Sequence, residues 1–210
     1  GLALALMPIE GFQRIVPVLI AVASLSLFIK VQEQITPLKQ KIEYLWLTAI
    51  GFYAMAKNTY GSSNFAVGGC ALFCNTSGGH NVAIGYAAMY GANTGSYNVA
   101  IGYSASYSAS TAVNNVAIGY QAMYYSDNTI NNTAVGYKAM FSNITGDQNT
   151  ALGNSALYTN TTGFDNVAIG YNALAKNTTG CQNFAVGNNA LCGMLTGSYN
   201  VGFGCKVGLG

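Results

Sequence analysis

Five Asn-x-Ser/Thr sequons are the residues whose types and spacing point most directly to chemistry, because such sequons accept N-linked glycans. They begin at Asn75, Asn131, Asn143, Asn160 and Asn177. All except Asn131 are separated by multiples of 17 residues. We therefore expect these four to line one edge of any structure with that period. The alternative is that Asn-Thr-Thr-Gly is simply a favourable turn.

Catalytic side chains are scarce in this chain. It contains one histidine, His80, with three Asp and three Glu, and no two of these acids are closer than ten residues in sequence. Asp147 and Asp165 would become neighbours in a 17-residue repeat and are the one candidate acid–base pair. Gln148 and Gln182 beside them favour a solvated turn instead. A phosphate-binding Gly-x-x-x-x-Gly-Lys-Ser/Thr loop is missing, so we expect no enzyme, no cofactor and no catalytic residue.

The five cysteines do not form a disulfide framework. Their odd number excludes complete pairing within the chain. They are Cys70, Cys74, Cys181, Cys192 and Cys205. In an extended segment Cys70 and Cys74 would lie about 13 Å apart, too far for a disulfide bond. With His80 they could be metal ligands, but small buried side chains explain them better, and we expect no metal site.

These residues belong to a repeat that starts at Leu47 and continues without insertion to the end of the chain. Each copy contains an anchor similar to Asn-Val-Ala-Ile-Gly, and we number its positions from that Asn (column 1) to column 17. The anchor glycines recur every 17 residues at Gly51, Gly68, Gly85, Gly102, Gly119, Gly136, Gly153, Gly170, Gly187 and Gly204. A fixed short period predicts a solenoid, here of about ten coils.

Within one coil we expect two strands and two turns. Columns 1–5 alternate β-branched and small residues, as a short strand does, and the apolar columns 6–10 form a second strand. Columns 12–17 are turn residues, with a glycine such as Gly180 placed for positive φ. Coils about 4.8 Å apart would give an all-β parallel β-roll or β-solenoid roughly 48 Å long.

The columns predict which side chains meet inside the coil. Columns 3 and 8 are almost entirely alanine, which suggests that the two faces of a thin roll, or neighbouring chains, approach closely there. Columns 4 and 9 hold Ile, Val, Leu and Met and are the expected buried apolar ladders. Column 1 is Asn from Asn64 to Asn200, which predicts an inward ladder of amide hydrogen bonds. A tolerated turn asparagine is the alternative.

The copies that begin Asn81-Val-Ala-Ile-Gly-Tyr-Ala-Ala and Asn115-Val-Ala-Ile-Gly-Tyr-Gln-Ala resemble the head repeats of trimeric autotransporter adhesins. The longer form that begins Asn149-Thr-Ala-Leu-Gly-Asn-Ser-Ala is similar to repeats of phage and large-virus tail fibres. The resemblance covers residues 47–210 and implies a parallel β-roll, commonly of three chains, that projects from a surface and contacts a host. The 17-residue period departs from the shorter adhesin period, and no membrane-anchoring β-barrel segment follows.

The charge of the repeat region excludes several partners. Residues 47–210 contain seven charged residues: Lys57, Lys138, Lys176, Lys206, Asp127, Asp147 and Asp165. No basic stripe could neutralise phosphates, so we expect no nucleic acid. No acidic cluster could hold calcium as aspartate-rich solenoid repeats do.

Residues 1–46 break the pattern and form a separate apolar segment. An uncharged run from Ile15 to Ile29, which includes Val18 and Ile20, is shorter than the roughly 20 residues of a membrane-spanning helix. It fits a buried helix or strand at an assembly interface, a membrane or virion anchor, or a signal-like leader.

A short amphipathic helix can follow this run. Its apolar seam repeats at spacings of four and three, as in a coiled coil, although Pro37 would kink the helix. The seam residues are Val31, Ile35, Leu38, Ile42 and Leu45. A packed amphipathic helix is the alternative. We expect residues 1–46 to serve in anchoring or assembly and residues 47–210 to form the rod.

These features predict a non-enzymatic structural or adhesive fibre component that is extracellular, on a cell surface or on a virion. It would associate with itself, as a trimer or head-to-tail filament, and contact a host-surface glycan or receptor. An ice- or glycan-binding solenoid is the alternative, because Thr145, Thr162, Thr179 and Thr196 form a threonine ladder. A polysaccharide-degrading β-helix enzyme has the right architecture but lacks the acids.

Overall fold

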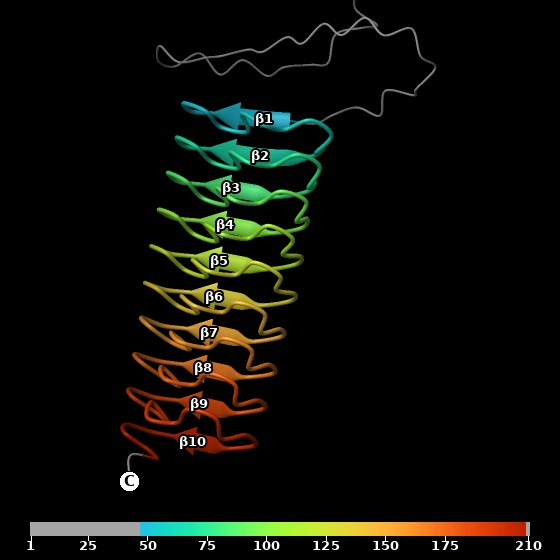
Figure 1. The fold of residues 1–210 in the computed structure, drawn as a ribbon. Helices are drawn as coiled ribbons and strands as arrows, with labels where there is room; N and C mark the ends of the chain where they lie inside the picture. Colours follow the sequence, from blue (N-terminus) through green and yellow to red (C-terminus); the bar gives the residue numbers. More distant parts are fainter. Residues whose placement is uncertain (1–46, 209–210) are drawn as a thin grey trace, which may run out of the picture.

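The computed structural model describes residues 47–208, and its strands form one parallel sheet. Sheet order follows chain order from β1 to β10, so successive coils stack along a rod (Figure 1). The strands are β1 (Leu47–Ile50), β2 (Asn64–Val67), β3 (Val82–Ile84), β4 (Val99–Ile101), β5 (Val116–Ile118), β6 (Thr133–Val135), β7 (Thr150–Leu152), β8 (Val167–Ile169), β9 (Phe184–Val186) and β10 (Val201–Phe203). The predicted all-β parallel solenoid is confirmed.

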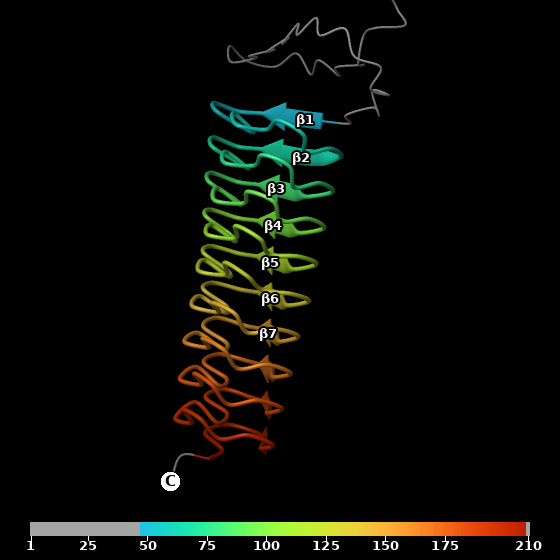
Figure 2. The ribbon, with the colours of Figure 1, turned by 45° about the vertical axis from the view of Figure 1, so that its right-hand side comes forward.

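The register of the sheet is set by the 17-residue repeat. Val99 pairs with Val116 and Ala100 with Ala117, and the same offset holds for every pair of strands. The other segments of each coil also lie one above another (Figure 2). Like residues therefore stack in columns along the axis, as the sequence predicted.

Column 4 does not form a buried ladder, and that prediction is wrong. In each strand from β3 to β6, the column 3 alanine is buried, whereas the residues of columns 2 and 4 on either side of it are half-buried. Because successive strand residues point to opposite faces, columns 2 and 4 both face outward. The sequence pattern identified the strand but not which of its faces is inside.

The second predicted strand, columns 6–10, is instead a series of turns. Columns 7 and 9 adopt left-handed backbone conformations: Ala87 has φ 53° and Met89 has φ 52°. An extended strand cannot contain such residues. The N–H of Met89 nevertheless donates to the carbonyl of Ala105 in the next coil at 2.9 Å. These turns are therefore linked between coils by backbone hydrogen bonds, although they form no strand.

The core is a thin layer in which columns 3, 8 and 9 meet. The alanines of column 3 from Ala66 on and of column 8 from Ala71 on are fully buried, as are Leu72, Met89 and Met123 of column 9. Close approach of two faces at the alanine columns and burial of column 9 are thus confirmed. Ser106 replaces the apolar residue in one coil, and its hydroxyl lies 3.4 Å from that of Ser126, so it has a polar partner.

Two glycine columns are required for different reasons. Gly119 in column 5 has φ 134°, and a Cβ there would overlap the carbonyl of Gly136 in the next coil. Gly180 in column 15 does not have the predicted positive φ. Glycine is required at this position because a Cβ would overlap the Gly197 carbonyl and the Asn177 side chain. The left-handed residue of this turn is Gln182, with φ 56°.

Candidate binding surfaces

The asparagines of column 1 form a buried hydrogen-bonded ladder. The Oδ1 of Asn98 accepts hydrogen bonds from the backbone N–H and the Nδ2 of Asn115, at 2.9 and 3.2 Å. The Nδ2 of Asn98 donates to the Ala112 carbonyl at 2.6 Å. The same arrangement recurs along the rod, so the predicted inward ladder is confirmed. These amides hold the coils together and are not available to a ligand.

Four of the five sequon asparagines are also inside the rod. Asn75, Asn143, Asn160 and Asn177 are fully buried in column 12. In Asn160, Nδ2 donates to the Asn143 Oδ1 at 2.6 Å and to the Gly163 carbonyl at 2.9 Å. A glycan on that nitrogen would break this packing, so the structure argues against the predicted glycan edge and favours the turn interpretation. Asn131 differs in being exposed.

Two buried oxygens show where the column 12 ladder stops. The Oδ1 atoms of Asn75 and Asn177 have no hydrogen-bond partner in the described residues. In the next coil, column 12 is Ala92 after Asn75 and Met194 after Asn177, and neither side chain can donate a hydrogen bond. The two unpaired oxygens are therefore ladder ends, not ligand sites.

The outer face of the sheet is an extended, mostly apolar surface along the rod. It consists of columns 2 and 4, in which every residue between Thr48 and Phe203 is Val, Ile, Leu, Phe or Thr. Several of these side chains are well exposed: Phe65 is 39 % and Val201 is 67 % accessible. We call columns 2 and 4 of β1–β10 the outer sheet face. It carries no charge.

Aromatic residues form two stacked columns that were not predicted. Column 6 stacks Tyr86, Tyr103, Tyr120 and Tyr137, with ring centroids 5.3–5.4 Å apart. Column 10 stacks Phe73, Tyr90, Tyr107, Tyr124, Phe141 and Tyr158 at 4.9–5.3 Å. The recurrence of aromatic residues in these two columns was visible in the sequence.

Stacking changes the chemistry of the tyrosines. The pKa of Tyr107 is raised above its ordinary value, first by burial and then by the neighbouring Tyr90. The pKa of Tyr124 is raised by burial and by Tyr107. These two phenols therefore stay neutral at physiological pH. Their ring faces are covered by their neighbours, so a ligand meets only ring edges and hydroxyls along most of the column.

A groove of about 400 Å³ lies between the two aromatic columns. Its lining includes Tyr86, Tyr107, Ser104 and Gln121. The groove is interrupted in the next coil, because the Nζ of Lys138 lies 5.3 Å from the ring centroids of both Tyr137 and Phe141.

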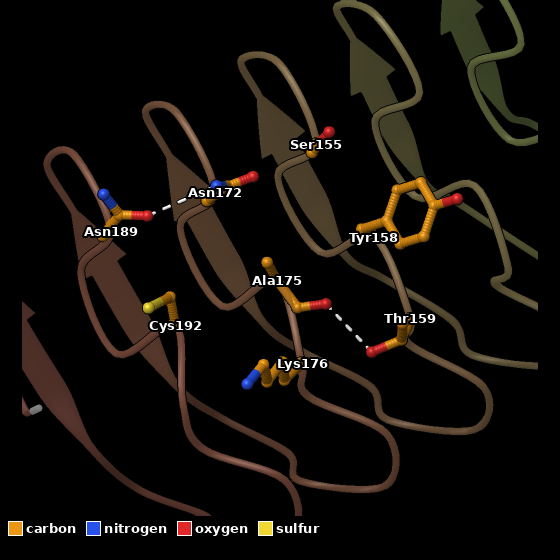
Figure 3. A pocket seen from close by; sticks show the side chains of 8 residues that line it. All are labelled: Ser155, Tyr158, Thr159, Asn172, Ala175, Lys176, Asn189 and Cys192. Carbon is orange, nitrogen blue, oxygen red and sulfur yellow. Dashed lines mark hydrogen bonds between the residues drawn. The ribbon is translucent and has the colours of Figure 1, made fainter.

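A second hollow, of about 270 Å³, lies where the column 10 stack ends (Figure 3). Its lining residues are Ser155, Tyr158, Thr159, Asn172, Ala175, Lys176, Asn189 and Cys192. Column 10 continues after Tyr158 with Ala175 and Cys192, which cannot stack on its ring. The hollow is therefore a direct result of the change from aromatic to small residues in this column.

The structure places Asp147 and Asp165 side by side in adjacent coils, as predicted: the Asp165 N–H donates to the Asp147 carbonyl at 3.1 Å. The His80 ring stacks on Tyr97 at 4.8 Å. The carboxylate of Asp147 accepts the Ile130 backbone N–H at 2.7 Å, which links two coils. The five cysteines are free, and none of them is buried, so their predicted role as small buried side chains is wrong. Between residues 47 and 208, no three His, Cys, Asp or Glu residues gather as metal ligands would.

The threonine ladder lies on an exposed turn edge. Thr145, Thr162, Thr179 and Thr196 are all exposed. The adjacent column 13 hydroxyls are already used, because Thr161 Oγ1 donates to the Thr178 carbonyl and Thr178 Oγ1 to the Leu195 carbonyl, both at 2.9 Å. This surface therefore presents one column of exposed threonine hydroxyls, in column 14, and not two adjacent columns.

The predicted assembly residues Ile15, Val18, Ile20, Val31, Ile35, Leu38, Ile42 and Leu45 lie outside the described residues. Within residues 47–208, no helix is long and apolar enough to cross a bilayer.

Comparisons of this chain with protein-family models, with curated proteins and with solved structures gave no match.

Proposed function

We propose that this protein is a non-enzymatic structural or adhesive fibre component whose rods associate side by side through the outer sheet face. The observation that carries the proposal is the uncharged, mostly apolar surface of columns 2 and 4 along the rod. The resemblance to adhesin-head and fibre repeats points to the same role, and to an extracellular, cell-surface or virion location.

The size of this face supports a partner. Ten strands spaced about 4.8 Å apart, with two outward columns about 7 Å apart, cover roughly 340 Å² before neighbouring columns are counted. The largest apolar patch on a typical monomer is about 300–600 Å² and is often functional.

The spacing of the face favours a second copy of this chain as the partner. Val99, Val116 and their equivalents repeat once per coil along the rod. A surface with any other spacing would match them over a few coils at most. A second copy has the same spacing over its whole length, so its ridges can fit between these side chains throughout. A trimer and a staggered filament both meet this condition.

The interior supports a mechanical role for the rod. The column 1 amides and the inter-coil backbone bonds link each coil to the next. Each coil is therefore stabilised mainly by its neighbours, as in other solenoids.

The double variant Ile101→Lys/Ile118→Glu tests the proposal in the full chain. These residues are paired on adjacent strands, so the new charges attract each other within the sheet. They would have to be buried in an assembly, which is costly. The control, Ile144→Lys/Leu195→Glu, places one charge of each sign at exposed apolar residues off this face, three coils apart.

Light scattering coupled to size exclusion should find wild type and control assembled and the face variant monomeric, with unchanged far-UV circular dichroism. Equal masses for all three proteins would contradict association through the outer sheet face.

A further inference from the structure

We propose that the hollow beside Tyr158 binds one pyranose unit of an acidic glycan, with the sugar ring on the Tyr158 ring and its carboxylate toward Lys176. This inference deepens the proposed adhesive function, because it gives a ligand class and a site to a rod whose association uses a different face.

The aromatic platform comes from the end of the column 10 stack. Phe141 covers one face of Tyr158, with ring centroids 5.2 Å apart. The next coil places Ala175 where the following ring would be, so the other face of Tyr158 is open to the hollow (Figure 3). Every ring from Tyr90 to Phe141 in this column has stacked neighbours on both sides. Phe73, at the other end of the stack, is contacted by the Tyr53 ring and by the Lys57 Nζ, so Tyr158 differs from the other rings in having an open face.

The polar groups around this platform are neutral hydrogen-bonding groups and one cation. Asn172 donates from Nδ2 to the Asn189 Oδ1 at 3.3 Å, which leaves its own Oδ1 to accept from a ligand hydroxyl. Ser155 also lines the hollow, and its hydroxyl donates to the Asn154 Oδ1 at 2.8 Å, so its lone pairs can accept. Lys176 is exposed, and it is the one charged residue among the described residues that line the hollow.

This combination fits an acidic pyranose better than other ligands. Pockets for small molecules usually combine an apolar or aromatic surface with a few polar groups that fix orientation. The C–H face of a sugar ring packs on an aromatic ring, and its hydroxyls bond to amides and hydroxyls. A carboxylate on the sugar would be attracted by Lys176 and would meet no acidic residue of the lining.

The dimensions limit the ligand to about one sugar ring at this place. The hollow measures about 270 Å³, just below the lower end of the range for drug-sized ligands. In the coil that precedes Tyr158, the Lys138 side chain lies between Tyr137 of column 6 and Phe141 of column 10. A longer glycan would therefore place one unit in the hollow and leave the remainder in solvent.

The variant Ala175→Tyr is the sharpest test, because it continues column 10 and covers the open face of Tyr158. The added stacked pair should raise the melting temperature by about 2–4 °C, while loss of the platform should abolish measurable glycan binding. Ala56→Tyr is the matched control, since Ala56 occupies column 10 at the opposite end of the same stack. It should leave binding unchanged.

Binding is measured by isothermal titration calorimetry of the full chain with tetragalacturonate and with its carboxyl-reduced, neutral form. We expect the wild type to bind the acidic tetramer more tightly, and Lys176→Gln to remove that preference while keeping neutral binding. AMP serves as a stacking ligand without a pyranose.

Three outcomes would overturn the inference: no glycan binding by the wild type, undiminished binding by a folded Ala175→Tyr variant, or tighter binding of AMP than of either glycan. Because the face variant Ile101→Lys/Ile118→Glu retains the hollow, loss of assembly in that protein leaves this test unaffected.

Discussion

At the scale of single residues, the stability of the rod depends on amides that satisfy one another along the axis. Asn115 accepts from the backbone N–H of Asn132 and donates to the Asn98 Oδ1 and the Thr129 carbonyl. Polar groups can occupy such a thin interior only because each has a partner in the adjacent coil. Small residues in columns 3 and 8 let the two sides of the coil come close enough for these bonds.

Replacing Asn115 with leucine, which has a similar shape, should destabilise the protein by about 2–4 kcal/mol. The substitution leaves the Asn132 N–H and the Thr129 carbonyl without these partners in a buried place. Urea unfolding followed by circular dichroism measures the change. Asn128→Leu is the control, because Asn128 is exposed and its backbone is not left-handed. A loss no larger than that of the control would show that the ladder contributes little.

The residue types predicted the column 1 ladder correctly, but they did not show that the asparagines of four sequons are buried. Column 1 is Asn in nine successive copies, a repetition that a solvent-exposed turn does not require. Asn160 carries a glycosylation sequon, yet its amide bonds to Gly163 and Asn143. The three-residue motif contains no information on whether its asparagine points outward. That depends on the turn and on the next coil.

At the scale of elements, one half of each coil was predictable and the other was not. Val-Ala-Ile is a strand in both sequence and structure. Columns 6–10 also contain apolar residues, but alternate residues take left-handed conformations without being glycine, such as Lys138 and Met140. Left-handed backbone is normally signalled by Gly or Asn. Here regular stacking of whole coils outweighs the local preference of each residue.

Gln121→Gly distinguishes this turn from the strand that we predicted. Gln121 has φ 52°, where a side chain costs about 1–2 kcal/mol and glycine costs unfolded-state entropy of about 0.4–1 kcal/mol. We therefore expect the free energy of unfolding to stay level or to rise by up to about 1.6 kcal/mol.

The control for this measurement is Thr133→Gly in β6, an outward strand residue. Glycine there should lower the free energy of unfolding by about 0.5–1 kcal/mol. If Gln121→Gly destabilises the protein as much as Thr133→Gly does, the left-handed conformation of column 7 is wrong.

At the scale of the whole molecule, the period was enough to predict a rod but not which side of it is apolar. Because Ile118 and its column were assigned to the interior, the outward apolar face remained unnoticed. The error has a physical basis: the interior is only wide enough for alanine in the strand, so the larger apolar residues are placed outside. Exposed β-branched residues in every coil are then a cost that association can offset.

The most direct test of association through the outer sheet face is hydroxyl-radical footprinting of the unmodified full chain at a concentration where it assembles. Phe65 and Phe184 lie on that face, whereas Phe164 lies in a turn, and the three side chains are 39 %, 36 % and 45 % accessible in a single chain. Their intrinsic reactivity is the same, so Phe164 is an internal control. We predict that Phe65 and Phe184 are oxidised several times more slowly than Phe164 because a second copy covers them. Comparable oxidation rates for all three phenylalanines would contradict the account.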